Sequence, residues 1–274
     1  MRKSWLAIAL LVAACGSSAP AKDTAPKEDS SAELDAGPSM LGTEEKLGEL
    51  REVEFTTEDD VIIHGTLHPS LVRQSHEQQS DGVVLFVHQL GSTREEWTAF
   101  VSLLGQTHSS LSIDLRGHGA SVYQSDGTAL DQESFTEEDW KKTVLDVRAA
   151  VSYLRDLQPA PKSITLVGSS IGSSAALLYA AQDREVDALV MLSPGLAYRG
   201  MRLLAEAKKL KNLPVLLVAM SGDRDSAKAA RLLSRKVRGS TLQIFKGDGH
   251  GVTMSGPVVP EVVEFVKRNP GSQP

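Results

Sequence analysis

The chain has 274 residues, with 35 acidic and 29 basic side chains and a formal net charge of −6. Aromatic residues make up only 5% of it. An acidic chain with few aromatic side chains offers little of the cationic surface and few of the stacking groups that nucleic-acid binding uses, so we expect no nucleic-acid partner. The single cysteine, Cys15, excludes a disulfide within the chain, and no histidine, cysteine and carboxylate cluster has metal-ligand spacing.

The first fifteen residues resemble a bacterial lipoprotein signal. A short basic region, Met1 to Lys3, precedes an apolar stretch from Trp5 to Ala13. This stretch is too short to span a bilayer. Small residues lead to Cys15, which has no disulfide partner and lies at the processing position, so we expect it to be lipidated after residues 1–14 are removed. An ordinary secretory signal that happens to contain a cysteine, or a cytosolic start, is the alternative.

Residues 15–48 form the expected lipidated tether, and residues 49–274 the folded domain. From Gly16 to about residue 46 the chain contains almost no large apolar side chains, so it cannot bury enough surface to fold. The lipoprotein resemblance implies a domain anchored by lipid in the bacterial cell envelope, either periplasmic or surface-exposed. Glycine rather than aspartate after the cysteine favours the outer membrane over the inner one.

Hydrophobic patterning from residue 51 onward predicts an α/β domain with a mostly parallel sheet of about eight strands and helices on both faces. Alternating polar and apolar residues predict an antiparallel hairpin at the sheet edge. The predicted strands are residues 51–56, 61–67, 83–87, 110–114, 163–167, 187–192, 214–219 and 241–245.

Helical spacing of apolar residues predicts a core-facing helix over residues 138–157, and a further helix is expected over residues 226–237. Only some twenty residues separate Leu192 from Pro214. This interval has room for a basic amphipathic helix at residues 201–210 but not for a large cap domain. A site at this edge of the sheet should therefore be fairly open.

A serine at the end of the fifth predicted strand has the context of a nucleophile elbow. Gly168-Ser169-Ser170-Ile171-Gly172 follows the apolar run Ile164 to Val167 and opens an Ala/Leu-rich helical run. A tight strand-to-helix turn pushes such a serine out of the sheet, and flanking glycines permit the turn and close helix packing. Ser170 is therefore the candidate nucleophile. The five-residue pattern is weak alone, because glycine-rich strand-helix corners are common.

A serine nucleophile needs a histidine base and a carboxylate that orients the base. His250, between two glycines after the last predicted strand, is the candidate base, since in this architecture the histidine follows the serine and the acid along the chain. Asp223 and Asp225 both follow the strand at residues 214–219. We favour Asp223 as the acid and expect Asp225 to begin the next helix, where the helix dipole favours negative charge. A turn that ends in Asp225 is the alternative.

Acyl transfer also needs two backbone N–H groups directed at the developing oxyanion. The residue after the nucleophile, Ile171, supplies the first by position. The second should come from the loop after the strand at residues 83–87, where Leu90 is the candidate donor.

The chain resembles the α/β-hydrolase superfamily, in the branch of small serine esterases, dienelactone-hydrolase-like and serine-aminopeptidase-like proteins. Four blocks carry the resemblance in the family's order: residues 88–97, residues 114–121 (DLRGHGAS), the elbow at Ser170, and Gly249-His250-Gly251. One position departs from the family, because Gln89 occurs where a glycine usually follows the histidine. The geometry of the oxyanion loop therefore cannot be carried over directly.

The resemblance implies a lipid-anchored serine hydrolase that cleaves a small-molecule carboxylic ester through an acyl-enzyme and needs no cofactor or metal. Thioesterase or peptidase activity uses the same chemistry and is the nearest alternative. A hydrolase-fold envelope lipoprotein without catalytic activity is the alternative from a different class, because a fold does not fix a function.

Overall fold

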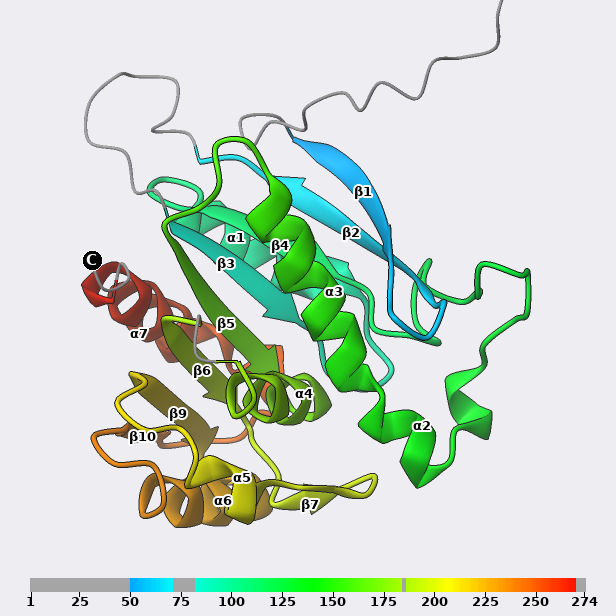
Figure 1. Ribbon diagram of the computed structural model, residues 1–274. Coiled ribbons are helices and arrows are strands. Elements are labelled where there is room, and N and C mark those ends of the chain that lie inside the picture. Colours follow the sequence, from blue (N-terminus) through cyan, green and yellow to red (C-terminus); the bar gives the residue numbers. More distant parts are fainter. Residues whose placement is uncertain (1–49, 71–81, 184–185, 270–274) are drawn as a thin grey trace, which may run out of the picture. The chain divides into compact units, whose positions relative to one another are not determined.

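The computed structural model describes residues 50–70, 82–183 and 186–269 (Figure 1). The predicted signal segment, Cys15 and the tether lie outside these ranges. None of the helices in the described part of the chain is long and apolar enough to cross a membrane.

Eight strands form one mostly parallel sheet, which confirms the predicted fold class. Their order in space is β1-β2-β4-β3-β5-β6-β9-β10, and only β1 with β2 and β2 with β4 pair in antiparallel fashion. Each predicted strand is found, with ends within two residues of the prediction. The strands are β1 (Arg51–Thr56), β2 (Ile62–His68), β3 (Gly82–Val87), β4 (Ser109–Ile113), β5 (Ser163–Ser169), β6 (Ala188–Leu192), β9 (Val215–Met220) and β10 (Thr241–Phe245).

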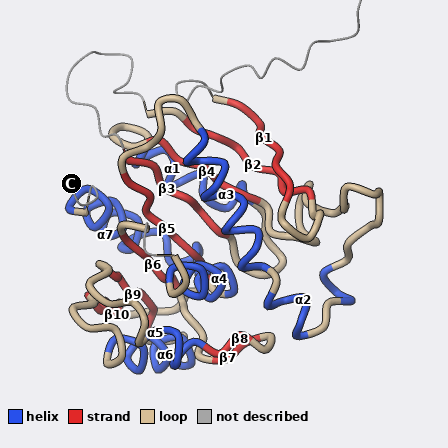
Figure 2. Tube along the Cα trace, viewed as in Figure 1, coloured by secondary structure: helices blue, strands red, loops and turns tan. Residues whose placement is uncertain are grey.

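Helices cover both faces of this sheet, as the continuous apolar runs of the central strands require (Figure 2). In β3, Val84 and Phe86 belong to a core with α1 (Thr98–Leu104) and α7 (Ser255–Arg268). The alternate residues of β3, Val83, Leu85 and Val87, belong to the opposite core. That second core includes side chains of α3 (Thr143–Asp156), α4 (Ile171–Ala180) and α6 (Arg224–Ser234).

The helix predicted over residues 138–157 is two helices, α2 (Glu137–Lys141) and α3. A capping box between Thr136 and Asp139 starts α2. The break follows at Lys142, and the hydroxyl of Thr143 donates to the carbonyl of Trp140 at 2.8 Å. Such a local side-chain bond offers the backbone an alternative to the regular helical pattern, which periodicity does not reveal.

The prediction of a helix over residues 201–210 is also wrong in its extent. The chain instead forms a small hairpin of β7 (Ala197–Tyr198) and β8 (Met201–Arg202), followed by α5 (Leu203–Ala207). Arg199 and Gly200 form its turn with φ of 50° and 77°. Two successive left-handed residues are the requirement of a tight hairpin turn, so the amphipathic pattern gives way to turn chemistry here.

Candidate active site

The parallel arrangement brings the carboxyl ends of β3, β4, β5, β9 and β10 to the same edge of the sheet. The loops that leave these ends contain every catalytic candidate from the sequence. In open α/β sheets this edge is where ligands bind. The strand order therefore gathers residues that are up to 160 positions apart in the chain.

Ser170 lies in a strained turn between β5 and α4. Its φ of 51° and ψ of −111° are outside the conformations that non-glycine residues usually adopt. The Ser170 N–H donates to the carbonyl of Leu192 at 2.8 Å, which ties the turn to the end of β6. A Cβ atom at Gly172 would lie 2.2 Å from the carbonyl oxygen of Val87, so only glycine allows α4 to approach β3 this closely.

His250 and Asp223 are in direct contact at the ends of β10 and β9. The distance between His250 Nδ1 and Asp223 Oδ2 is 2.6 Å. A carboxylate only accepts hydrogen bonds, so Nδ1 carries the proton and Nε2 is left as an acceptor. Partial burial would raise the pKa of Asp223, but hydrogen bonds from His250 and Ser226 outweigh it and hold that pKa below its usual value. Asp223 is thus an anion at neutral pH.

Asp225 has a different position from the one that we expected. Asp223, not Asp225, is the N-cap of α6, and its Oδ1 accepts the N–H of Ser226 at 3.2 Å. Asp225 lies within the first turn of α6, because the helix begins two residues earlier than predicted. One carboxylate thus caps the helix and contacts His250 at the same time.

The loop after β3 is organised by a buried histidine. The N–H of Leu115 donates to His88 Nε2 at 2.9 Å, so Nδ1 bears the proton and donates to the carbonyl of Gln89 at 2.7 Å. Burial lowers the pKa of His88 to about 3, which keeps the ring neutral. The two candidate oxyanion donors are the N–H groups of Leu90 and Ile171. Among the described residues, neither has a hydrogen-bond partner.

Ser170 and His250 open into one pocket of about 610 Å³. Its apolar side comes from the segment that enters the β7–β8 hairpin, with Pro194, Leu196 and Tyr198. Its polar side comes from α6, with Asp225 and Lys228. The pocket can therefore take an amphiphilic molecule next to the serine.

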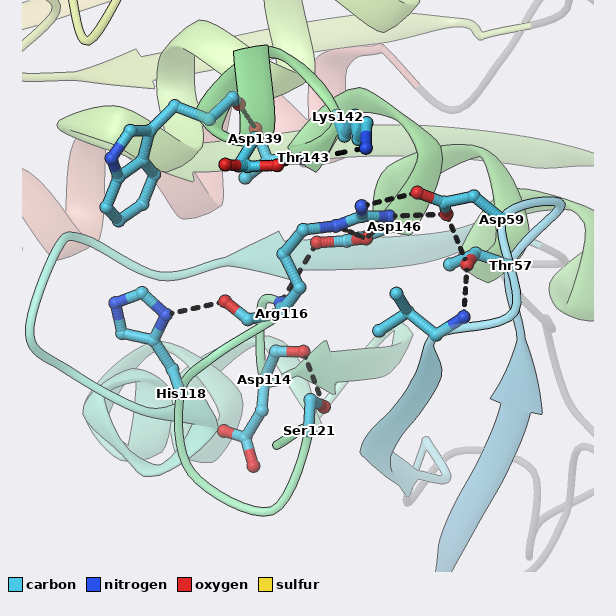
Figure 3. Close-up of polar contacts among 12 residues, drawn as sticks. Thr57, Asp59, Asp114, Arg116, His118, Ser121, Asp139, Lys142, Thr143 and Asp146 are labelled. Atoms are coloured by element: carbon cyan, nitrogen blue, oxygen red, sulfur yellow. Dashed lines mark hydrogen bonds and ion pairs between the residues drawn. The ribbon is translucent and has the colours of Figure 1, made fainter. Parts of the chain in front are cut away.

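A buried ion cluster supports the loop after β4, and its members were not predicted from the sequence (Figure 3). Arg116 bonds Asp146 on α3 at 2.7 Å and Asp59 on the β1–β2 turn at 2.7 Å. In the same loop, the Ser121 hydroxyl donates to the carbonyl of Asp114 at 2.9 Å. These contacts account for the DLRGHGAS block as a structural element behind the site.

A second residue that sequence reasoning missed is Ser193, at the end of β6. Its hydroxyl accepts the N–H of Gly251 at 2.9 Å and so fixes the residue after His250. Ser193 has a φ of 46°, a conformation that only the folded chain reveals. The one available signal was its position just after a buried strand.

Comparisons with known proteins agree with this geometry. The family model described as serine aminopeptidase, S33, matches residues 78–238, more than half of the chain. A segment of 139 residues is 29% identical to the chloroplastic protein PHYLLO of Arabidopsis thaliana, a match that covers 50% of this chain and only 8% of that protein.

Solved structures show the same fold at low identity. An esterase of Pyrococcus furiosus has a TM-score of 0.63 at 21% identity, over 82% of this chain and 92% of that one. A dienelactone hydrolase of Anabaena variabilis has a TM-score of 0.60 at 19% identity, over 81% and 97% of the two chains. The family match places the chain in the serine aminopeptidase S33 family, and the solved structures share its α/β-hydrolase fold.

Proposed function

We propose that the protein cleaves carboxylic esters through an acyl-enzyme on Ser170. The observation that carries the proposal is the strained Ser170 turn, which shares a pocket with a His250 imidazole oriented by Asp223 at 2.6 Å. Strained serine backbones persist where the surrounding structure holds them, and they cluster at active sites. No cofactor is required for this chemistry.

In the first step, Ser170 Oγ attacks the ester carbonyl carbon and His250 Nε2 takes the hydroxyl proton. The carbonyl oxygen becomes an oxyanion, which the N–H groups of Leu90 and Ile171 would bind. His250 then gives the proton to the leaving alkoxide, the carbon–oxygen bond breaks, and the acyl group remains on Ser170. The ionised Asp223 stabilises the positive charge that His250 carries between these events.

In the second step, water replaces the serine as the nucleophile. His250 takes a proton from the water, hydroxide attacks the acyl carbon, and the proton returns to Ser170 Oγ as the acid product leaves. The same sequence would hydrolyse a thioester or a peptide, with a thiol or an amine as the leaving group.

Covalent labelling of the purified full chain with a fluorophosphonate tests the proposal. Ser170→Ala should abolish labelling and lower hydrolysis of short p-nitrophenyl esters by on the order of 10³-fold or more. Ser174→Ala, one turn along α4 and lining the same pocket, should retain labelling. A wild-type chain that neither labels nor hydrolyses esters would favour a non-catalytic hydrolase-fold protein.

A peptidase is the second candidate, because the matching family model is described as a serine aminopeptidase. Both candidates use Ser170, so the discriminating quantity is the ratio of kcat/KM for a p-nitrophenyl ester to that for an aminoacyl p-nitroanilide with the same acyl group. We expect the ester to be preferred beyond its greater intrinsic reactivity in buffer. A preference for the anilide would establish the peptidase.

We also propose that Cys15 anchors the protein in the cell envelope, with the outer membrane favoured. The support is the basic start, the short apolar stretch and the lone cysteine of the sequence. Cys15→Ala should remove incorporation of a radiolabelled fatty acid and shift the chain out of the membrane fraction. Incorporation that survives the substitution would contradict the proposal.

A further inference from the structure

Gln89, the residue that departs from the family pattern, lies in the loop after β3 and contacts residues beside the nucleophile and beside the base. Its side-chain Oε1 accepts the hydroxyl of Ser169 at 3.3 Å, next to the nucleophile. The same atom packs against Gly251, next to the base: a Cβ atom at Gly251 would lie 2.0 Å from Gln89 Oε1. Gln89 itself precedes Leu90, the candidate oxyanion donor.

The backbone of Gln89 is fixed as firmly as its side chain. Its N–H donates to Glu96 Oε1 at 3.1 Å, and its carbonyl accepts His88 Nδ1 at 2.7 Å. The carbonyl also accepts the N–H of Ser92 at 3.2 Å, which closes the loop around Leu90. A glycine here could keep the backbone bonds but would lose both side-chain contacts.

The partners of Gln89 are themselves buried or tightly held. Ser169 is completely buried at the end of β5, and Gly251 has a φ of 56° and donates to Ser193. A side chain packed between them transmits a displacement of one loop to the other two. The amide group of Gln89 is thus a spacer between the elbow and the histidine loop.

We propose that Gln89 is a positioning residue that holds the oxyanion loop, the Ser170 elbow and the His250 loop in register. The proposal rests on the proposed function of Ser170 and His250. Gln89 acts through its neighbours and takes no part in bond making. In this chain the side-chain contacts replace the freedom that a glycine would give the oxyanion loop.

The expected effect follows from how steeply catalysis depends on position. A misplacement of about 1 Å costs on the order of 10²-fold in rate, because the reacting atoms must be in near-attack geometry. Gln89→Met keeps the length of the side chain and removes its hydrogen bond. We expect kcat for a p-nitrophenyl ester to fall about 10- to 100-fold while KM changes less than about three-fold.

The experiment compares full-length wild type, Gln89→Met, Ser169→Ala and the double variant. Fluorophosphonate labelling should slow by the same factor as kcat, because labelling uses the same three loops. If the Ser169–Gln89 bond carries the effect, the double variant should be no slower than Gln89→Met alone, which is the mark of coupled residues. Gln106→Met, at an exposed position after α1, is the matched control and should leave kcat unchanged.

Hydrogen exchange gives a readout that does not depend on catalysis. Gln89→Met should raise exchange in both residues 88–92 and residues 249–252, whereas a local packing defect would affect only the first segment. Unchanged exchange in residues 249–252, or an unchanged kcat, would overturn the proposal. A wild-type chain that fails to label refutes the proposed function, and the exchange data still decide whether Gln89 joins the loops.

Discussion

Two acid–base contacts in this protein have nearly the same length and opposite roles. His250 and Asp223 line the pocket and meet at 2.6 Å, and the histidine side chain is 49% exposed. Arg116 and Asp146 meet at 2.7 Å behind the site, where the side chains are 4% and 0% exposed. The first contact leaves Nε2 of the imidazole as a hydrogen-bond acceptor beside the pocket, whereas the second pairs a guanidinium with a carboxylate inside the protein.

This difference shows that exposure of a side chain to the pocket, and not the size of its pKa shift, identifies the candidate site. Burial raises the pKa of Asp146 to about 6 although Arg116 opposes this, and burial lowers the pKa of His88 to about 3. Neither group lines the pocket. Strongly shifted groups cluster at functional sites, but buried structural networks shift them as well, as the Arg116 cluster does here.

Asp223→Asn should give the largest effect on turnover and tests the exposed contact. An asparagine amide presents an N–H group to His250 Nδ1, which stabilises the tautomer with its proton on Nε2. The corresponding change costs about 10⁴-fold in a serine protease triad, and we expect a comparable order in kcat. Asparagine is as good an N-cap as aspartate, so the melting temperature should change little.

Asp225→Asn is the matched control, since it alters the same pocket by the same atoms two residues away. It should keep turnover and cost about 1 kcal/mol of stability or less. The reverse pattern would move the acid to Asp225. If Asp223→Asn and Asp225→Asn both stayed active while Ser170 was still required, the proposed triad mechanism would be wrong.

Arg116→Met should give the largest effect on stability and tests the buried contact. It leaves the fully buried Asp146 without a compensating charge, a change that costs about 3 to 5 kcal/mol when one partner of a buried pair is removed. The loss should be smaller at pH 5 than at pH 7, because an acid whose folded pKa is raised favours the folded state only while it is protonated. Urea unfolding at the two pH values measures both effects.

Arg148→Met is the control on the surface. Arg148 bonds Glu58 at 3.0 Å with its side chain 42% exposed, and such pairs contribute about 1 kcal/mol or less. If both variants lost the same stability, the contrast between the buried and the exposed arginine would be unfounded. Below its melting temperature, Arg116→Met should still label at Ser170.

The sequence was sufficient for the sheet and for the residues that share its carboxyl edge. Apolar runs locate the buried strands, and the turn glycines on either side of Ser170 and His250 mark the loops that leave them. Chain order then placed Asp223 between them, and the structure brings Asp223 to His250. All of these signals are local in the chain.

The parts that sequence reasoning missed depend on contacts between distant segments. Asp59 and Asp146 are 87 positions apart and meet only through Arg116. The start of α6 was misjudged because Asp223 serves two partners, a helix N-terminus and a histidine, and a local pattern cannot assign both. For the same reason, Gln89 was visible only as a departure from a family pattern, since Ser169 and Gly251 are 80 and 162 positions away.

Glu96 is a partly buried acid beside the candidate site, and it lies between the exposed Asp223 contact and the buried Asp146 contact in character. Burial raises its pKa to about 7 despite hydrogen bonds from Ser92 and Gln89, and its Oε2 has no hydrogen-bond partner within the described residues. Between pH 4.5 and about 7 the unfolded chain ionises this group while the folded chain keeps the proton, so the free energy of unfolding falls as pH rises.

Glu96→Gln removes that titration and keeps an oxygen to accept the Gln89 N–H. The variant should therefore gain stability relative to wild type on going from pH 5 to pH 8, by on the order of 1 kcal/mol, measured by urea unfolding. Glu95→Gln is the control: the hydrogen bond from Thr93 outweighs slight burial and lowers the pKa of Glu95, so replacing this acid should give no such gain. If both variants followed the wild-type curve between pH 5 and 8, Glu96 would be ionised in the folded chain, and the carboxylate that holds Gln89 would belong with the exposed acids.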